Sequence, residues 1–393
     1  MKRLCVLIIA LAMVSVMVAP AFATWTRVVT MGNQNMFIQD DYNMWMWTST
    51  VNNYPRHLII DHSVSASALE FGSYEDIDGG TRVGMVVPFL SHSVLGAFIS
   101  DFDQEWSLNP DEADQAIDLF YGYRGTNFDL GAHVDYYNRG NEFGGKQGQS
   151  AIGLNAGVGF NVNGNMLEIN GMYRSISWDW EEQYASPTPY DPLNENDGSS
   201  DMGIAARYLI AYNSMVTLVP AFAYRQQKIA EKVTAAPGFG SGQEFKTTGW
   251  DLGIGCNTVP LQGTEFLTSI GVRSASEKYT DSSGAITYYD QEDAHFPYLA
   301  LGSEIQVKNW LQFRFGAEKT WDSFEDKSVT TGVPEYKESG ASFNYMVGAG
   351  VMVGDLQFDV EVNPSWFNAG PYFLSGSSAG DMFGWISIKY DYR

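Results

Sequence analysis

An apolar/polar alternation with a period of two most constrains what this chain can fold into. In residues 127–136, Phe128 and Leu130 share one face, whereas Asp129 and His133 take the other. The same pattern recurs along the chain and is strong in its last residues, 383–393 (FGWISIKYDYR). A period of two is typical of β-strands whose two faces meet different environments. The alternating segments are longer than the strands of an ordinary soluble sheet, so the sequence predicts an all-β protein.

The connections between these segments alternate between short and long. The predicted tight turns lie at 91–93, 124–125, 163–164, 213–214, 260–263, 308–309 and 354–355, and the predicted long polar loops at 72–80, 101–114, 138–149, 179–200, 230–244, 279–294, 322–339 and 368–379. Short turns at one end and long loops at the other are typical of a transmembrane antiparallel up-and-down β-barrel. We expect about 16 strands beginning near Val64, with 14 as the alternative. A strong last strand then has a reason, because it must pair with the first strand to remove both sheet edges.

The N-terminus carries an export signal. Residues 1–23 place Lys2 and Arg3 before an apolar stretch and end in a small-x-small pattern at Ala23, which predicts a signal peptide. The alternative is an uncleaved anchor, for which the apolar run is short. No later apolar run is long enough for a spanning helix. We therefore expect the mature chain to cross a bacterial outer membrane with strands.

Charge and cysteine content exclude several classes of function. The chain has 23 basic and 46 acidic residues, a balance that repels the phosphates of nucleic acids. Cys256 is the only cysteine after the signal, so neither an internal disulfide nor a thiol metal site is expected.

Two stretches resemble known families. The closing segment, 384–393, resembles the last strand of bacterial outer-membrane β-barrels of the porin-like kind, with Arg393 following the usual terminal aromatic residue. Residues 30–55 are similar to the N-terminal hatch of fatty-acid-transporter-type barrels in Met31-Gly32, Asp40-Asp41 and Asn43. We therefore expect three regions, namely a signal peptide at 1–23, a hatch or rim segment at 24–56 and a barrel at 57–393. The segment at 24–56 either plugs the lumen or lies against the periplasmic rim.

The polar phase of the strands supplies the candidate site residues. If the apolar phase meets lipid, the interior receives the predicted pore-lining residues Arg82, Asp129, His133, Asp135, Arg207, Arg225, Asp251, Arg273, Glu304, Arg314, Glu318, Asp359, Glu361 and Lys389. So many charges require either a hydrated channel or an ion-pair network that fills the interior. Tryptophans near strand ends are expected in the membrane girdle, namely Trp178, Trp180, Trp250, Trp310, Trp321, Trp366 and Trp385.

Neither a catalytic nor a metal site is predicted. Asp101, Asp103, Glu105 and Glu112 echo the spacing of a calcium loop, but Trp106 stands where that loop needs glycine, which favours a solvated acidic loop. Residues 194–201 form a weaker version. His133 and Asp135 lack a nearby nucleophile in any motif, so we expect no enzyme and no cofactor.

These patterns favour an outer-membrane porin-like channel or transporter for small solutes, working by passive diffusion through a charged lumen. The alternative is a non-transporting structural or adhesive barrel with acidic extracellular loops. The expected partners are outer-membrane lipid, the barrel-assembly machinery and a small-molecule solute. The sequence leaves the identity of the solute and any oligomeric state open.

Overall fold

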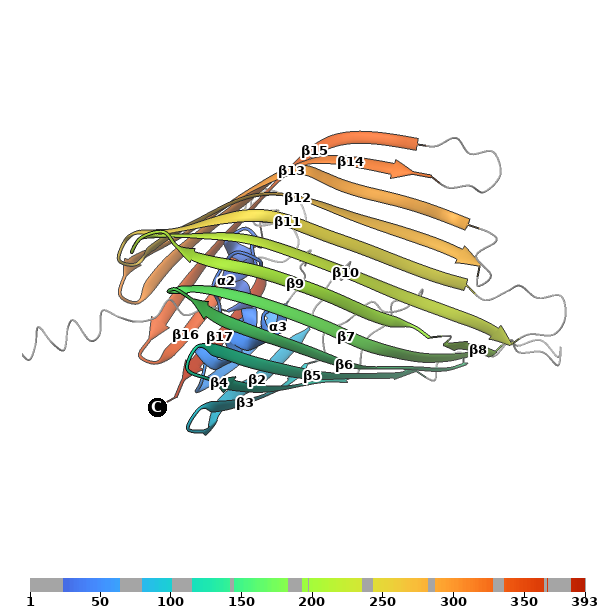
Figure 1. Cartoon of the computed structure of the whole chain (residues 1–393), viewed down its shortest axis with the longest axis horizontal. Helices are drawn as coiled ribbons and strands as arrows, with labels where there is room; N and C mark the ends of the chain where they lie inside the picture. Colours follow the sequence, from blue (N-terminus) through green and yellow to red (C-terminus); the bar gives the residue numbers. More distant parts are fainter. Residues whose placement is uncertain are drawn as a thin grey trace, which may run out of the picture.

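The computed structural model describes residues 24–63, 80–100, 115–141, 145–182, 193–196, 198–234, 243–281, 287–327, 336–363, 366 and 383–392. Its strands form one antiparallel sheet (Figure 1). They are β1 (His57–Ser63), β2 (Thr81–Leu90), β3 (Ser93–Ser100), β4 (Gln115–Arg124), β5 (Phe128–Asn141), β6 (Gly145–Val162), β7 (Asn165–Glu182), β8 (Leu193–Asn196), β9 (Ser200–Ala211), β10 (Val216–Thr234), β11 (Gln243–Leu261), β12 (Thr264–Asp281), β13 (Thr287–Lys308), β14 (Leu311–Asp326), β15 (Tyr336–Val353), β16 (Leu356–Val362) and β17 (Phe383–Asp391).

The sheet closes on itself through its first strand. Ile60 of β1 lies opposite Val83 of β2 on one side and Ile388 of β17 on the other. The short β8 and the longer β9 both lie between β7 and β10, so they share one position in the ring. The described residues therefore form a closed 16-strand antiparallel barrel, which confirms the predicted fold class.

The predicted start of the first strand, near Val64, was wrong. The first strand is β1, which begins at His57 and ends just before Val64. Its alternation is hidden in the sequence because Ile59, an apolar residue, points inward and is buried beside the inward Asp61. The segment predicted as the first strand, after Val64, lies outside the described residues.

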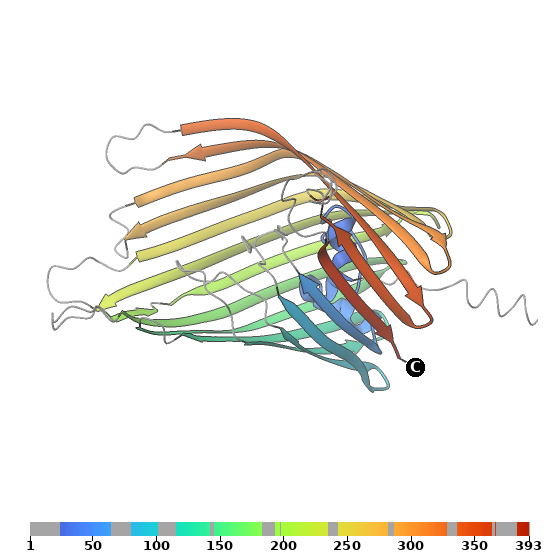
Figure 2. The same ribbon diagram turned by 180° about the vertical axis from the view of Figure 1, so that it is seen from behind.

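Many strands extend into segments that we expected to be loops. β13 has 22 residues, β10 and β11 have 19 each, and a membrane crossing needs only about 9–11. Figures 1 and 2 show the long middle strands running well past the short β1–β4, β16 and β17 on one side. The tight turns all lie at the opposite end, where the C-terminus also lies.

The outer surface carries the apolar phase of the strands. Large apolar side chains that point outward include Leu119, Leu154, Leu252 and Phe313, each about half exposed. This surface suits a lipid environment. Within the described ranges, no helix is long and apolar enough to cross a membrane.

The tryptophans divide between the two faces. Trp250, Trp310 and Trp321 are partly exposed, as expected of girdle residues. Trp385 contradicts the prediction, because it is 1% exposed and packs edge-on against Trp25 with ring centroids 5.6 Å apart. It faces inward because the interior at that height is filled by the N-terminal segment. The side chains of Trp178 and Trp180 lie outside the described part of the chain.

The N-terminal segment lies inside the ring of strands (Figure 1). It contains α2 (Trp25–Thr30), α3 (Asn43–Met46) and the 3₁₀ helix η1 (Thr48–Asn53). Helix α2 contacts β14–β17, whereas η1 contacts β3–β7, so the segment bridges opposite walls. We call residues 24–53 the hatch.

Candidate functional site: the hatch and the pocket against it

Helix α2 begins at a capped residue and carries the main anchor of the hatch. The Thr24 hydroxyl accepts a hydrogen bond from the Arg27 backbone amide, which satisfies one free donor of the first turn. The Arg27 guanidinium is 1% exposed and lies 3.0 Å from Asp40, 2.6 Å from Glu265 of β12 and 2.9 Å from Glu304 of β13. One buried cation therefore ties the two halves of the hatch to the wall.

A second arginine extends this cluster along the wall. Arg314 of β14 lies 2.6 Å from Glu304 and 2.7 Å from Asp359 of β16. The Thr24 hydroxyl donates to the same Asp359 carboxylate at 2.7 Å. Buried ions are tolerated only when they are paired in this way.

The carboxylates outnumber the arginines in the cluster. Arg27 and Arg314 face Asp40, Glu265, Glu304 and Asp359. Burial, together with the neighbouring Asp41 carboxylate, raises the pKa of Asp40 well above its usual value, although Arg27 opposes the shift. Burial also raises the pKa of Asp41.

The remainder of the hatch is held by other cations of the barrel. Arg207 of β9 pairs with Glu168 of β7 and donates to the Ile38 carbonyl at 2.8 Å. Its guanidinium also lies over the Trp47 ring, 4.5 Å from the centroid. On the opposite wall, the Lys389 ammonium lies 2.9 Å from Asp41.

Glycines of the wall allow the hatch backbone to approach closely. A Cβ atom at Gly131 would lie 2.0 Å from the Thr48 carbonyl oxygen, and one at Gly316 would lie 2.3 Å from the Gly32 nitrogen. No side chain can occupy such a position without displacing main chain. The main chain of the hatch therefore packs directly against these inward-facing glycines.

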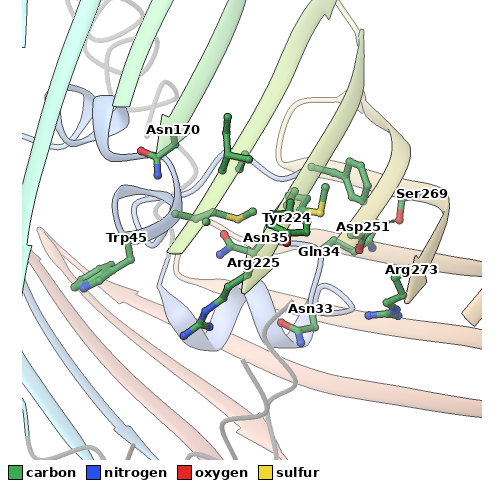
Figure 3. A pocket seen from close by; sticks show the side chains of 18 of the residues that line it. Asn33, Gln34, Asn35, Trp45, Asn170, Tyr224, Arg225, Asp251, Ser269 and Arg273 are labelled. Carbon is green, nitrogen blue, oxygen red and sulfur yellow. Dashed lines mark hydrogen bonds between the residues drawn. The ribbon is translucent and has the colours of Figure 1, made fainter. Parts of the chain in front are cut away.

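A pocket of about 180 Å³ lies between the hatch and the barrel wall (Figure 3). The hatch contributes residues 32–37 together with Trp45 and Met46, and the wall contributes residues from β6 to β14. Part of the lining is apolar, including Met36, Phe37, Met172 and Ala223.

The charged side chains of the pocket alternate in sign along the wall. Arg225 is on β10, Asp251 on β11, Arg273 on β12 and Glu318 on β14, and all four line the pocket. Arg273 forms an ion pair with Glu318 and lies over the Tyr298 ring, 4.6 Å from the centroid. The Tyr298 hydroxyl donates to Asp251 at 2.9 Å. The pocket therefore combines an apolar surface with a field that runs across it.

The structure divides the predicted pore-lining residues into three groups, all in the inward phase of the strands. Arg225, Asp251, Arg273 and Glu318 line the pocket. Arg82, Arg207, Glu304, Arg314, Asp359 and Lys389 contact the hatch or its ion pairs. The third group comprises Asp129, His133, Asp135 and Glu361. Three of these residues pair with other side chains of the wall, namely His133 with Asp118 at 2.8 Å, Asp135 with Arg174 at 2.6 Å and Asp129 with Arg124 at 3.0 Å. The fourth, Glu361, is 6% exposed.

Several residues of the ion-pair network were absent from the predicted set. They are Arg27, Asp118, Glu168, Arg174, Asp201 and Glu265. Glu168 and Arg174 could have been found, since they share their phase along 165–182 with the buried Asn170. Arg27 carried no such signal, because it precedes every strand.

The residues of the predicted calcium-like spacing, 101–114, lie outside the described residues. In the described part of the chain, no group of three or more histidine, cysteine or acidic residues is arranged to hold a metal ion.

A closed 16-strand barrel with an apolar outer surface and a charged interior defines the chain as a β-barrel of the outer-membrane type. No protein-family model matches the chain, and no curated protein matches it in sequence.

The solved structures to which the chain is similar include three outer-membrane proteins. To the ferric citrate transporter FecA it is 9% identical with a TM-score of 0.40, covering 79% of this chain and 66% of FecA. To the toluene transporter TodX of Pseudomonas putida it is 10% identical with a TM-score of 0.42, covering 94% and 96%. To the monoaromatic hydrocarbon channel CymD it is 9% identical with a TM-score of 0.38, covering 95% and 99%. The chain thus spans slightly less than two thirds of the length of FecA.

Proposed function

We propose that this barrel is an outer-membrane channel or transporter that admits small solutes by passive diffusion from the cell exterior. The observation that carries the proposal is the pocket between hatch and wall, because a purely structural barrel needs no cavity of about 180 Å³ lined by charges of alternating sign. The tight turns mark the periplasmic end. A solute then enters the lumen at the opposite end, where the long strands extend. It reaches the pocket first and then meets the hatch.

The residues that line the pocket determine which solutes it accepts. Arg225, Asp251, Arg273 and Glu318 produce a transverse field, which discriminates solutes by their charge distribution. Met36, Phe37 and Met172 offer an apolar surface to the uncharged part of the solute. Passage of a solute beyond the pocket requires the hatch to move, because the hatch lies across the lumen and its ion pairs reach opposite walls of the barrel. The predicted pore-lining residues that contact the hatch would then meet solute only in that open state.

We also propose how the chain is processed and assembled. The signal is removed after Ala23, which leaves Thr24 free to form the cap of α2 and to donate to Asp359. Residues 24–56 then form the hatch with its link to β1, and residues 57–393 form the barrel. The barrel-assembly machinery inserts the chain into a bacterial outer membrane, and β17 closes the ring.

Ion selectivity tests the role of the pocket charges. Replacing Arg273 by Ala removes the ion-pair partner of Glu318 and the cation that lies opposite Asp251 in the strand register. The reversal potential in a salt gradient should then move toward cation preference. Lys337→Ala is the matched control, since it also removes one cation, but from a 68% exposed side chain on the outer face that pairs with Glu325 at 3.6 Å. The control should keep the wild-type reversal potential.

A non-transporting adhesive barrel is the second candidate. It is favoured by the length of β10–β15, of which β13 has 22 residues and extends the sheet beyond a membrane's thickness. A protein that conducts no ions in planar bilayers, either as wild type or with a loosened hatch, would support this second function and overturn the first.

A further inference from the structure

Three lysines lie side by side on adjacent strands of the barrel. Lys228 of β10 is the register partner of Lys246 of β11, and Lys246 is the register partner of Lys278 of β12. The three strands are neighbours in the sheet (Figure 1). Such a row is unusual in a chain with 46 acidic and 23 basic residues. We call these three residues the lysine row.

The lysine row points outward. On β11, Leu252 is 52% and Trp250 38% exposed, whereas Asp251 between them is 4% exposed and faces the lumen. Lys246 shares the phase of Leu252 and Trp250, and the pairing of β11 with β10 and β12 has no bulge between these positions. The side chains of Lys228 and Lys278 are 34% and 50% exposed.

The row lies above the apolar band, on the side away from the tight turns. Lys246 is four residues beyond Trp250 along β11, which is about 13 Å of extended strand. With the strand tilt of a membrane barrel this becomes roughly 10 Å along the membrane normal. Because tryptophan marks the boundary between lipid and water, the lysine row falls at the level of the outer-leaflet headgroups.

The charges of the row are incompletely neutralised by the protein. Lys228 lies 2.9 Å from Glu244, and Lys278 lies 3.8 Å from Asp290. Lys246, between two other cations, has no ion pair with any residue that the structure describes. Like charges directly opposite on neighbouring strands are destabilising, so this arrangement calls for an external anion.

The neighbouring strands differ in this respect. Farther round the same outer face, Lys327 lies 3.2 Å from Glu292, and Lys337 lies 3.6 Å from Glu325. Those lysines alternate with carboxylates and need no further counter-ion. The excess positive charge is therefore concentrated on β10–β12.

We propose that the lysine row binds the phosphate groups of an anionic glycolipid in the outer leaflet of the membrane. A phosphomonoester carries close to two negative charges and three acceptor oxygens, so one group can bridge Lys246 and a neighbouring lysine. The site faces lipid rather than the lumen, and this inference therefore goes beyond the proposed transport function and does not depend on conductance.

Native mass spectrometry of the full-length barrel in detergent tests the site. The probes are diphosphorylated lipid A, the same lipid without phosphate, and inorganic phosphate. Wild type should retain diphosphorylated lipid A in preference to the dephosphorylated form. Lys246→Gln should weaken its retention roughly fivefold, and the triple change of Lys228, Lys246 and Lys278 to Gln about a hundredfold, from the usual contribution of one lysine at a charged membrane surface.

Lys337→Gln is the matched control, because it removes an outward lysine at 68% side-chain exposure that already has a carboxylate partner. It should bind like wild type. Equal retention of both lipid forms by wild type, or an equal loss in Lys337→Gln and Lys246→Gln, would overturn the proposal. Displacement of the lipid by millimolar inorganic phosphate would show a site for free phosphate and would also overturn it. A heat-modifiable band for each variant checks that the barrel has folded.

Discussion

Replacing Gly131 by Ala should release the hatch while leaving the barrel closed. The added Cβ would lie 2.0 Å from the Thr48 carbonyl oxygen and 2.5 Å from the Ser49 nitrogen, both main-chain atoms of η1. Since real Cβ atoms do not approach so closely, η1 must move. Overpacking of this kind costs about 1–3 kcal/mol.

Movement of η1 also breaks hydrogen bonds that hold it. Thr48 donates to the Asn170 side chain at 2.7 Å, and the Asn52 amide donates to the Leu130 carbonyl at 2.9 Å. Each is worth about 1 kcal/mol net. The total is about 3–5 kcal/mol against docking, or a factor of more than a hundred in the docking equilibrium.

Hydrogen exchange of the hatch amides measures this effect directly. Residues 48–53 should lose protection in Gly131→Ala, whereas the strand amides should keep theirs. Gly159→Ala is the control, because this glycine also lies on an inward position near η1, but its Cβ would come no closer to another atom than 3.3 Å. Its nearest neighbours would be the flexible Met166 sulfur at 3.3 Å, Ser49 Oγ at 3.5 Å and Asp129 Cβ at 3.8 Å. If the hatch amides are as protected from exchange in both variants as in wild type, the wall glycines are not what allows the hatch to dock.

Two further changes test the anchors of the hatch. Arg27→Gln leaves the buried Asp40 without its cation and leaves Glu304 with Arg314 alone, so it should weaken docking by about 3–5 kcal/mol. The effect is measured as faster exchange of the α2 amides, and wild-type exchange would contradict the anchoring role. Because the pKa of Asp40 is raised in the docked hatch, docking takes up a proton. The stability due to this group is complete below its undocked pKa, about 3.9, and is lost as pH rises through the docked value. Hatch protection should therefore decrease with rising pH in wild type and be flatter in Asp40→Asn; identical pH profiles would refute the assignment.

The sequence alone was sufficient for the fold class. Alternation places Leu130 and Asp129 on opposite faces whatever the partners are, because side chains along a strand point to alternate sides. Turn residues such as Asn163-Gly164 locate the tight hairpins, and Gly164 has the positive φ of 85° that such a turn requires. A strong final strand also predicted closure. These signals are local, so they could be found without a structure.

The interior depended on the tertiary structure. Arg27 and Glu304 are 277 positions apart, and only the register of the closed barrel brings them to 2.9 Å. Trp385 has the pattern of a girdle residue, yet it faces inward because Trp25 fills the lumen beside it. Whether an inward charge lines a pocket or holds the hatch depends on which residue lies across the lumen, and the pattern along one strand contains no information about that residue. Alternation determines only which face a residue takes, whereas ion pairs depend on distances between strands and hatch that arise when the chain has closed.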